Sequence, residues 1–126
     1  MKIIRSKDLD ITPASHEDPK NPGVLKKILL QRDDLIDARI QMINWAFLKV
    51  GKSFQLHYHE DMQEVFIMLR GKVKMVIDDE EDTLYKGDAV IIPVGSKHTM
   101  TNISPEDAEY LAIGVAKGKR GKTIVH

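Results

Sequence analysis

The stretch GKSFQLHYHEDMQEVFIMLRG, residues 51–71, decides both the expected fold and the expected site. His57 and His59 stand two apart in a run typical of a β-strand, although the chain has only five histidines. Side chains two apart on a strand point to the same face, so both imidazoles can reach one metal ion. Glu64 can join them only if the polar EDMQ segment breaks the strand. A pair of structural or surface histidines is the alternative interpretation.

The rest of the chain consists of short apolar runs separated by turn signals. Residues 38–50 alternate at first and then become apolar on both faces, which predicts a strand buried on both sides. Further strand candidates are residues 24–31, 65–69, 72–78, 89–93 and 109–116, with a turn at 70–71 and a polar turn at 78–82. The sequence contains no amphipathic pattern long enough for a helix of about ten residues. The expected fold class is therefore all-β, a sandwich or a barrel.

Length and composition predict one domain that covers residues 1–126. With 42% apolar residues, the chain is long enough to bury a core of its own. Residues 1–23 are expected to form an N-terminal arm and loop, because residues 12–23 contain three of the five prolines. His16 lies in this loop and is expected to be solvated.

The charge balance limits the expected partners. The chain has 19 basic and 19 acidic residues, so no basic excess is available for a nucleic acid or an anionic membrane. The longest apolar runs are too short to span a bilayer, and the N-terminus lacks a signal-peptide core. The sequence has no cysteine, which excludes disulfides and thiolate chemistry. We expect a cytoplasmic protein.

A second stretch, GDAVIIPVGSKHTMTN at residues 87–102, makes the first one specific. Together the two stretches resemble the paired motifs of the cupin superfamily, in its small single-domain form. Residues 51–71 supply the first motif, whose positions are Gly51, His57, His59, Glu64 and Gly71. Residues 87–102 supply the second motif, whose positions are Gly87, Pro93, Gly95, His98 and Asn102. All ten positions of the family pattern match in order.

The resemblance implies a double-stranded β-helix, the jelly-roll barrel of cupins. It also implies that one divalent transition metal ion, whether Fe, Mn, Zn, Ni or Cu, is bound by four side chains. These expected ligands are His57, His59, Glu64 and His98. The alternative is a cupin that has lost its metal and keeps the histidines as polar core residues.

Strand parity gives an expected surrounding for the metal. Gln55 shares the parity of His57 and His59, so its side chain is expected to hydrogen-bond near the ligands. The expected pocket lining is Phe66, Met68, Met100 and Asn102. No Arg or Lys is clearly assigned to the inward face, which predicts a mainly apolar cavity and argues against a phosphosugar.

Two classes of function follow from the resemblance. The first is a metal-dependent enzyme acting on a small molecule, with dioxygenase-type oxidation favoured over decarboxylation or sugar isomerisation. The second is a non-catalytic module that binds a small molecule such as a sugar. A homodimer is also expected, because Val65, Ile67 and Leu69 form an apolar face opposite Glu64. Burial of that face under the N-terminal segment is the alternative.

Overall fold

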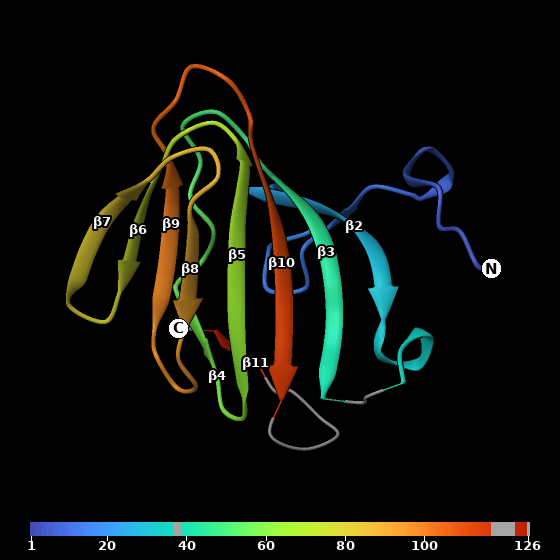
Figure 1. Ribbon diagram of the computed structural model, residues 1–126. Helices are drawn as coiled ribbons and strands as arrows, with labels where there is room; N and C mark the ends of the chain where they lie inside the picture. The colour runs from blue at the N-terminus through green and yellow to red at the C-terminus, as the bar shows by residue number, and fades with distance from the viewer. Residues whose placement is uncertain (37–38, 117–122, 126) are drawn as a thin grey trace.

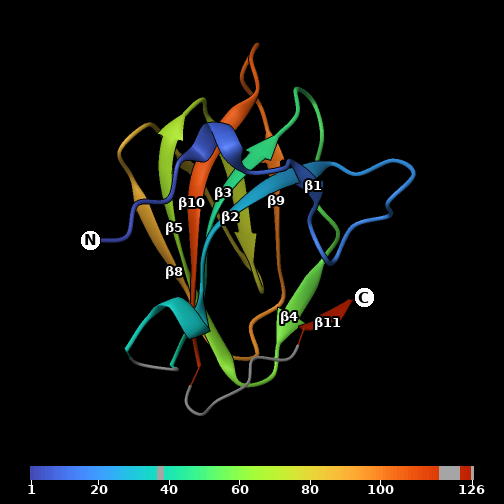
Figure 2. The same cartoon turned by 90° about the vertical axis from the view of Figure 1, so that its right-hand side faces the viewer.

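Two antiparallel β-sheets face each other in the computed structural model and enclose the core, as Figures 1 and 2 show. The structure describes residues 1–36, 39–116 and 123–125. The six-stranded sheet has the order β1-β2-β3-β10-β5-β8, and the five-stranded sheet has the order β11-β4-β9-β6-β7. The strands are β1 (Thr12–Pro13), β2 (Val24–Gln31), β3 (Ile40–Leu48), β4 (His57–His59), β5 (Met62–Arg70), β6 (Val73–Ile77), β7 (Glu80–Leu84), β8 (Ala89–Ile92), β9 (His98–Asn102), β10 (Ala108–Ala116) and β11 (Thr123–Val125).

Helical structure is confined, among the described residues, to two 3-10 turns. They are η1 (Ser6–Asp8) and η2 (Arg32–Asp34). No helix in this part of the chain is long and apolar enough to cross a membrane. The all-β expectation is confirmed, and the two sheets agree with the jelly-roll barrel.

The central strands of the six-stranded sheet owe their positions to strict alternation. In β10 every second residue is buried, from Ala108 to Ala116, and β10 pairs with β3 on one side and β5 on the other. The strand expected at 38–50 is β3, although Ala38 lies outside the described residues. The expected burial of both faces is wrong, because only alternate residues from Asn44 to Leu48 are fully buried. The predicted turn at 70–71 joins β5 to β6, with Gly71 at φ +87°. Only glycine adopts such a φ without strain.

The polar segment 78–82 differs from its prediction. Only its first two residues form the turn, with Asp78 at φ 51°, while β7 starts at Glu80 and pairs with β6. The acidic side chains of β7 are exposed at an edge of the five-stranded sheet. Exposed charge is a usual feature of edge strands, because it discourages pairing with another chain. The acidic residues 80–82, which were expected in a turn, therefore belong to a strand.

The apolar core fills one end of the space between the sheets. Its largest fully buried members include Leu48, Met68, Ile92 and Met100. Asn102 closes this end: its amide donates to the carbonyl oxygens of Leu48 and Glu106 at 2.9 and 2.7 Å. His98 starts the same strand that Asn102 ends, so the histidines lie toward the opposite end of β9.

Candidate metal centre

Four buried side chains meet between the sheets. His57 and His59 lie on β4, and β4 pairs with β9 at a single position, which sets His98 opposite His57. Glu64 comes from β5 in the other sheet, because the chain changes sheet between His59 and Met62. The predicted break in the EDMQ segment is therefore present. One ligand atom from each of these four residues lies within 4.8 Å of the others.

Backbone carbonyls fix the orientation of two imidazoles. The Nδ1–H of His57 donates to the carbonyl oxygen of Gln55 at 2.7 Å, and the Nδ1–H of His98 donates to that of Ser96 at 2.9 Å. A carbonyl accepts only from a protonated nitrogen, so Nε2 of each ring is left with its lone pair. Nε2 of His98 is buried and has no hydrogen-bond partner.

The carboxylate of Glu64 lies next to the imidazoles of His59 and His98. Its Oε1 lies 2.5 Å from Nε2 of His59 and 3.4 Å from Nε2 of His98. Burial alone would raise the pKa of Glu64, but the hydrogen bond with His59 and the nearby imidazole of His98 lower it to about 2. Burial lowers the pKa of His57 to about 3, helped by the nearby His16 and His98. Glu64 is therefore an anion and His57 is neutral, the forms that bind metals.

This donor set fits a divalent transition metal ion. Three imidazoles and one carboxylate are ligands that Fe, Mn, Zn, Ni and Cu accept, and four donors leave coordination positions for other oxygens. The unpartnered Nε2 of His98 is the strongest sign, because leaving a buried polar atom unpaired costs about 1–3 kcal/mol. A metal ion at the cluster would satisfy this atom. The four residues could therefore hold one ion.

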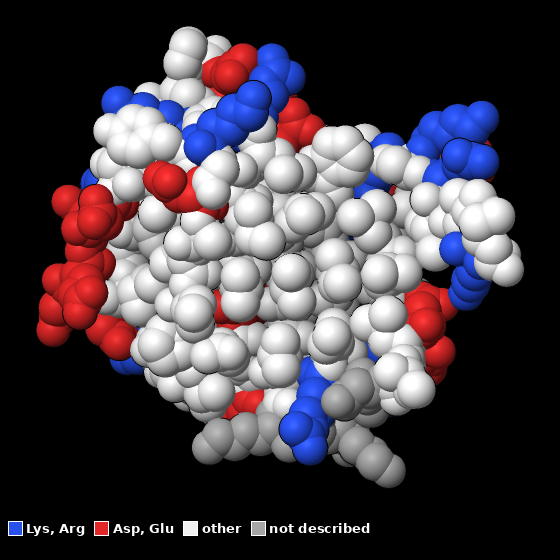
Figure 3. Space-filling view, in the orientation of Figure 1, with Lys and Arg blue, Asp and Glu red and all other residues white. Residues whose placement is uncertain are grey.

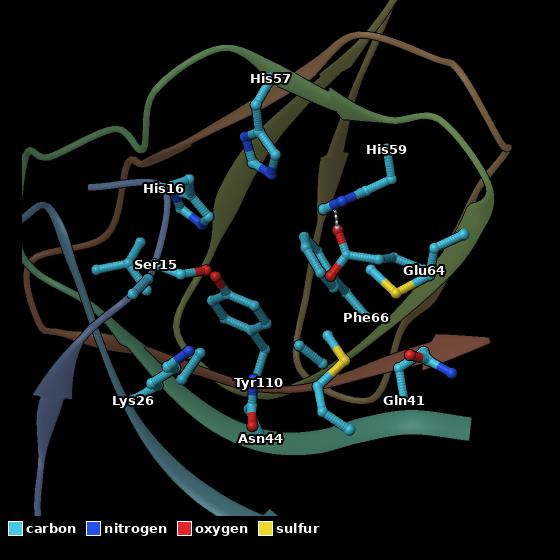
Figure 4. Close-up of a pocket in the computed structure, with 16 residues that line it drawn as sticks. Ser15, His16, Lys26, Gln41, Asn44, His57, His59, Glu64, Phe66 and Tyr110 are labelled. Carbon is cyan, nitrogen blue, oxygen red and sulfur yellow. Dashed lines mark hydrogen bonds and ion pairs between the residues drawn. The ribbon is translucent and has the colours of Figure 1, made fainter. Parts of the chain in front are cut away.

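A cavity of about 210 Å³ opens beside the cluster, as Figure 4 shows. It is smaller than the 300–1,000 Å³ typical of pockets for drug-sized ligands, so a small molecule fits it. Its lining is Ala14, Ser15, His16, Val24, Lys26, Gln41, Met42, Asn44, Ala46, His57, His59, Met62, Glu64, Phe66, Tyr110 and Ala112. The lining is thus mixed, with polar groups among the apolar ones.

A family model described as the cupin domain matches residues 44–114. The chain belongs to the cupin family. An uncharacterized protein of Methanocaldococcus jannaschii is 28% identical over 103 residues, which cover 82% of this chain and 78% of that protein. Quercetin 2,3-dioxygenase of Bacillus subtilis is 39% identical over 49 residues, which cover 39% of this chain and only 14% of the dioxygenase.

Solved structures show the same fold. The crystal structure of a protein from Thermotoga maritima, described as a predicted oxalate decarboxylase, superposes on this cupin with a TM-score of 0.80. The match covers 91% of this chain and 99% of that chain, at 22% sequence identity. At this identity the similarity establishes the architecture alone.

Several residues expected near the metal site lie elsewhere in this cupin. Phe66 lines the cavity, as expected, but Met68 and Met100 are packed in the apolar core and are not among its lining residues. Asn102 holds the loop at the far end of β9. The side chain of Gln55 is exposed, and only its backbone oxygen meets an imidazole. The parity argument does not hold for Gln55 because β4 begins at His57.

His16 is a functional candidate that the sequence reasoning missed. It was expected to be solvated, yet it lines the cavity and stacks on His57 with ring centroids 4.2 Å apart. The buried Glu17 holds this part of the arm, because its carboxylate accepts from the backbone N–H of Gly23 at 2.8 Å and of Gln55 at 3.0 Å. The pairing of β1 with β2 brings the arm across the pocket.

Lys26 also corrects the prediction that no cation faces inward. Val24 and Lys26 both line the cavity, whereas the side chain of Lys27 points outward and donates to the backbone oxygen of Ser6 at 2.8 Å. The signal was present, because residues two apart on a strand share a face and Val24 is apolar. The cavity of this cupin therefore contains one cation, although apolar groups still supply most of its surface, as expected.

Proposed function

We propose that this cupin is a metal-dependent enzyme acting on a small molecule, and that oxidation of a chelating enol-like or catechol-like substrate by O₂ is its leading reaction. The observation that carries the proposal is the four-donor cluster, which opens directly onto a small cavity. The local similarity to quercetin 2,3-dioxygenase supports the choice of reaction. That match spans a small part of the dioxygenase, so the substrate is not transferred with it.

Each group of side chains in the site has a separate role in the proposed reaction. A divalent metal held by His57, His59, Glu64 and His98 supplies a Lewis acid with open positions for substrate oxygens. The aromatic rings of Phe66 and Tyr110, whose centroids are 4.7 Å apart, form an apolar wall for the substrate. Burial, together with the nearby carboxylates, raises the pKa of Tyr110, so its hydroxyl remains a hydrogen-bond donor. His16 and its arm shield the cavity from water.

A second candidate is a reaction that does not consume O₂, either decarboxylation of a small acid or isomerisation of a sugar. Lys26 favours it, because a cation inside the pocket suits an acidic substrate. Binding of a small molecule such as a sugar without turnover is the remaining possibility. Neither the fold nor the family chooses among these, because function resides in the site and not in the scaffold.

An oxygen-electrode screen separates these functions. The protein is loaded in turn with each of the five metals and mixed with catechol, quercetin or dihydroxyfumarate. We expect O₂ uptake with a redox-active metal, its loss in His59→Ala, and its retention in the matched core variant Met100→Leu. Equal uptake in His59→Ala would place the oxidation outside this site. Turnover without uptake would favour the second candidate, and tight sugar binding without turnover would favour a binding protein.

We also propose that the protein forms a homodimer through the outer face of the six-stranded sheet. Val65, Ile67 and Leu111 lie on this face in neighbouring strands, with Ile91 at the edge in β8. Figure 3 shows that its centre is broad and almost free of charged side chains. A large uncharged face of this kind suits a second copy of the chain. Light scattering at micromolar concentration tests this, and a strict monomer would refute it.

A further inference from the structure

Opposite the metal ligands, the pocket wall carries polar groups without partners. Figure 4 shows Lys26 and Tyr110 across the cavity from His57 and His59. Among the residues that the structure describes, no ion pair or hydrogen bond involves the Lys26 side chain. Asn44 is only 7% exposed, and its Oδ1 has no hydrogen-bond partner. Leaving such an atom unsatisfied is costly, so its presence in a cavity wall indicates a ligand.

The register of the sheet places these groups side by side. Lys26 on β2 is paired with Ala46 on β3, and Asn44 lies two residues before Ala46 on the same strand. Lys26 and Asn44 are therefore diagonal neighbours on one face, about 7–8 Å apart along the sheet. No hydrogen bond joins the Lys26 ammonium to Oδ1 of Asn44, so one small ligand between the two side chains can reach both. Ala46 and Ala112, the latter paired with Asn44, leave the space for it.

The charges around the cavity favour an anion. Lys26 and Glu64 are its charged lining residues, and their formal charges cancel. A divalent ion at the cluster would leave the cavity with a net positive charge. Burial disfavours the charged form of Lys26 and lowers its pKa, although Glu64 acts in the opposite direction. A negatively charged ligand would offset this cost of burying the ammonium.

We propose that Lys26 and Asn44 form a carboxylate-and-hydroxyl subsite, and that the substrate is a small acid with an enolic or alcoholic hydroxyl and a second oxygen function for the metal. The ammonium of Lys26 binds the carboxylate. The side-chain amide of Asn44 forms a hydrogen bond with the substrate hydroxyl, which lies between the carboxylate and the oxygen directed at the metal ligands. This inference rests on the proposed function for the metal end of the site and adds the residues that select the substrate.

Three small probes of nearly equal size test the subsite by calorimetry on the metal-loaded protein. Malonate has two carboxylates, malonamate replaces one by an uncharged amide, and tartronate adds a hydroxyl to malonate. We expect wild type to bind tartronate more tightly than malonate, and malonate about tenfold more tightly than malonamate. Lys26→Met keeps the apolar stem and should abolish the preference for malonate over malonamate. Asn44→Leu should abolish only the preference for tartronate.

Lys27→Met is the matched control, because it removes the neighbouring lysine from the outer face. It should bind all three probes as wild type does. Equal loss of malonate binding in Lys26→Met and Lys27→Met, or equal binding of malonate and malonamate by wild type, would overturn the proposal. Lys26→Gln is measured alongside, so a folding defect in one variant does not decide the result. The comparison is repeated on metal-free protein, where the same Lys26-specific loss is expected.

Metal content and turnover are recorded for every variant. Selective probe binding by wild type, without turnover of the probes or of any substrate in the oxygen-electrode screen, would support the subsite and refute the proposed enzyme. Turnover of tartronate that is unchanged in Lys26→Met would refute the subsite and leave the enzyme standing. The two proposals therefore fail separately.

Discussion

Replacing His98 by Leu should leave the metal-free protein about as stable as wild type and remove its response to metal. His98 is 0% exposed, and its Nε2 has no hydrogen-bond partner. Removing that atom regains about 1–3 kcal/mol, while losing the 2.9 Å bond from Nδ1 to Ser96 costs about 1 kcal/mol. The net change in the free energy of unfolding without metal is therefore about zero to +2 kcal/mol.

When metal is present, wild type should be stabilised more than His98→Leu. Free metal at about 100 times its dissociation constant stabilises the folded protein by about 2.7 kcal/mol. The unfolding entropy of a chain of 126 residues is about 0.26 kcal/mol/K, so the wild-type melting temperature should rise by about 10 °C. A site weakened about 100-fold by the loss of one ligand would gain only about 0.4 kcal/mol, a rise of under about 2 °C.

Calorimetric melting with each metal and with a chelator measures both quantities. Met100→Leu is the matched control, since Met100 is equally buried on the same strand but is not a ligand. It should keep the full rise of about 10 °C. A rise of wild-type size in His98→Leu would show that the metal binds elsewhere. No rise in wild type with any of the five metals would show that the cluster is only a polar part of the core.

Three other perturbations give distinct results. In the metal-free protein, the free energy of unfolding should be about 2 kcal/mol lower at pH 5 than at pH 7. The reason is that the pKa of His57 is near 6.5 in the unfolded chain but near 3 in the folded chain. Denaturant titrations of wild type and His57→Phe test this, and an equal loss of stability in both would contradict it. Ala112→Leu should fill the cavity and abolish substrate turnover with unchanged metal content, and unchanged turnover would mean that the substrate binds elsewhere. Asn102→Ala should lower stability by about 2–3 kcal/mol in denaturant, because it frees the buried carbonyl of Leu48, without changing metal stoichiometry; a loss of metal would contradict this.

The four side chains that the sequence singled out lie together in the structure, and part of this arrangement follows from local geometry. His57 and His59 share a face through strand periodicity alone, and the motif positions supplied Glu64 and His98. The expected surroundings were less successful, because they depend on contacts between distant segments. His16 meets His57 across 41 residues of chain, through an arm that shows no strand pattern of its own. Nothing in the residues around His16 indicates such a contact.

Local parity also had limits at the ends of strands. Parity fails for Gln55 because β4 covers only three residues and begins at His57, whereas it holds for Lys26, which shares the inward face with Val24. Lysine in a strand is normally assigned to the solvent side, and Lys27 next to it follows that rule. The inward lysine is therefore indicated only by its position two residues after the apolar Val24.

The division of the four donors between two sheets has a consequence for how the molecule opens. Three donors come from the five-stranded sheet and Glu64 comes from the other, so an ion bound to all four would fasten the layers together. β4 contains three residues, and it pairs with β9 at one position and with the equally short β11 on its other side, which makes it a weak element on its own. In the metal-free protein its amide hydrogens should exchange with solvent early, through local opening. A bound metal ion should convert this stretch into one of the slowest-exchanging parts of the barrel, so that the ion would also stabilise the contact between the two sheets.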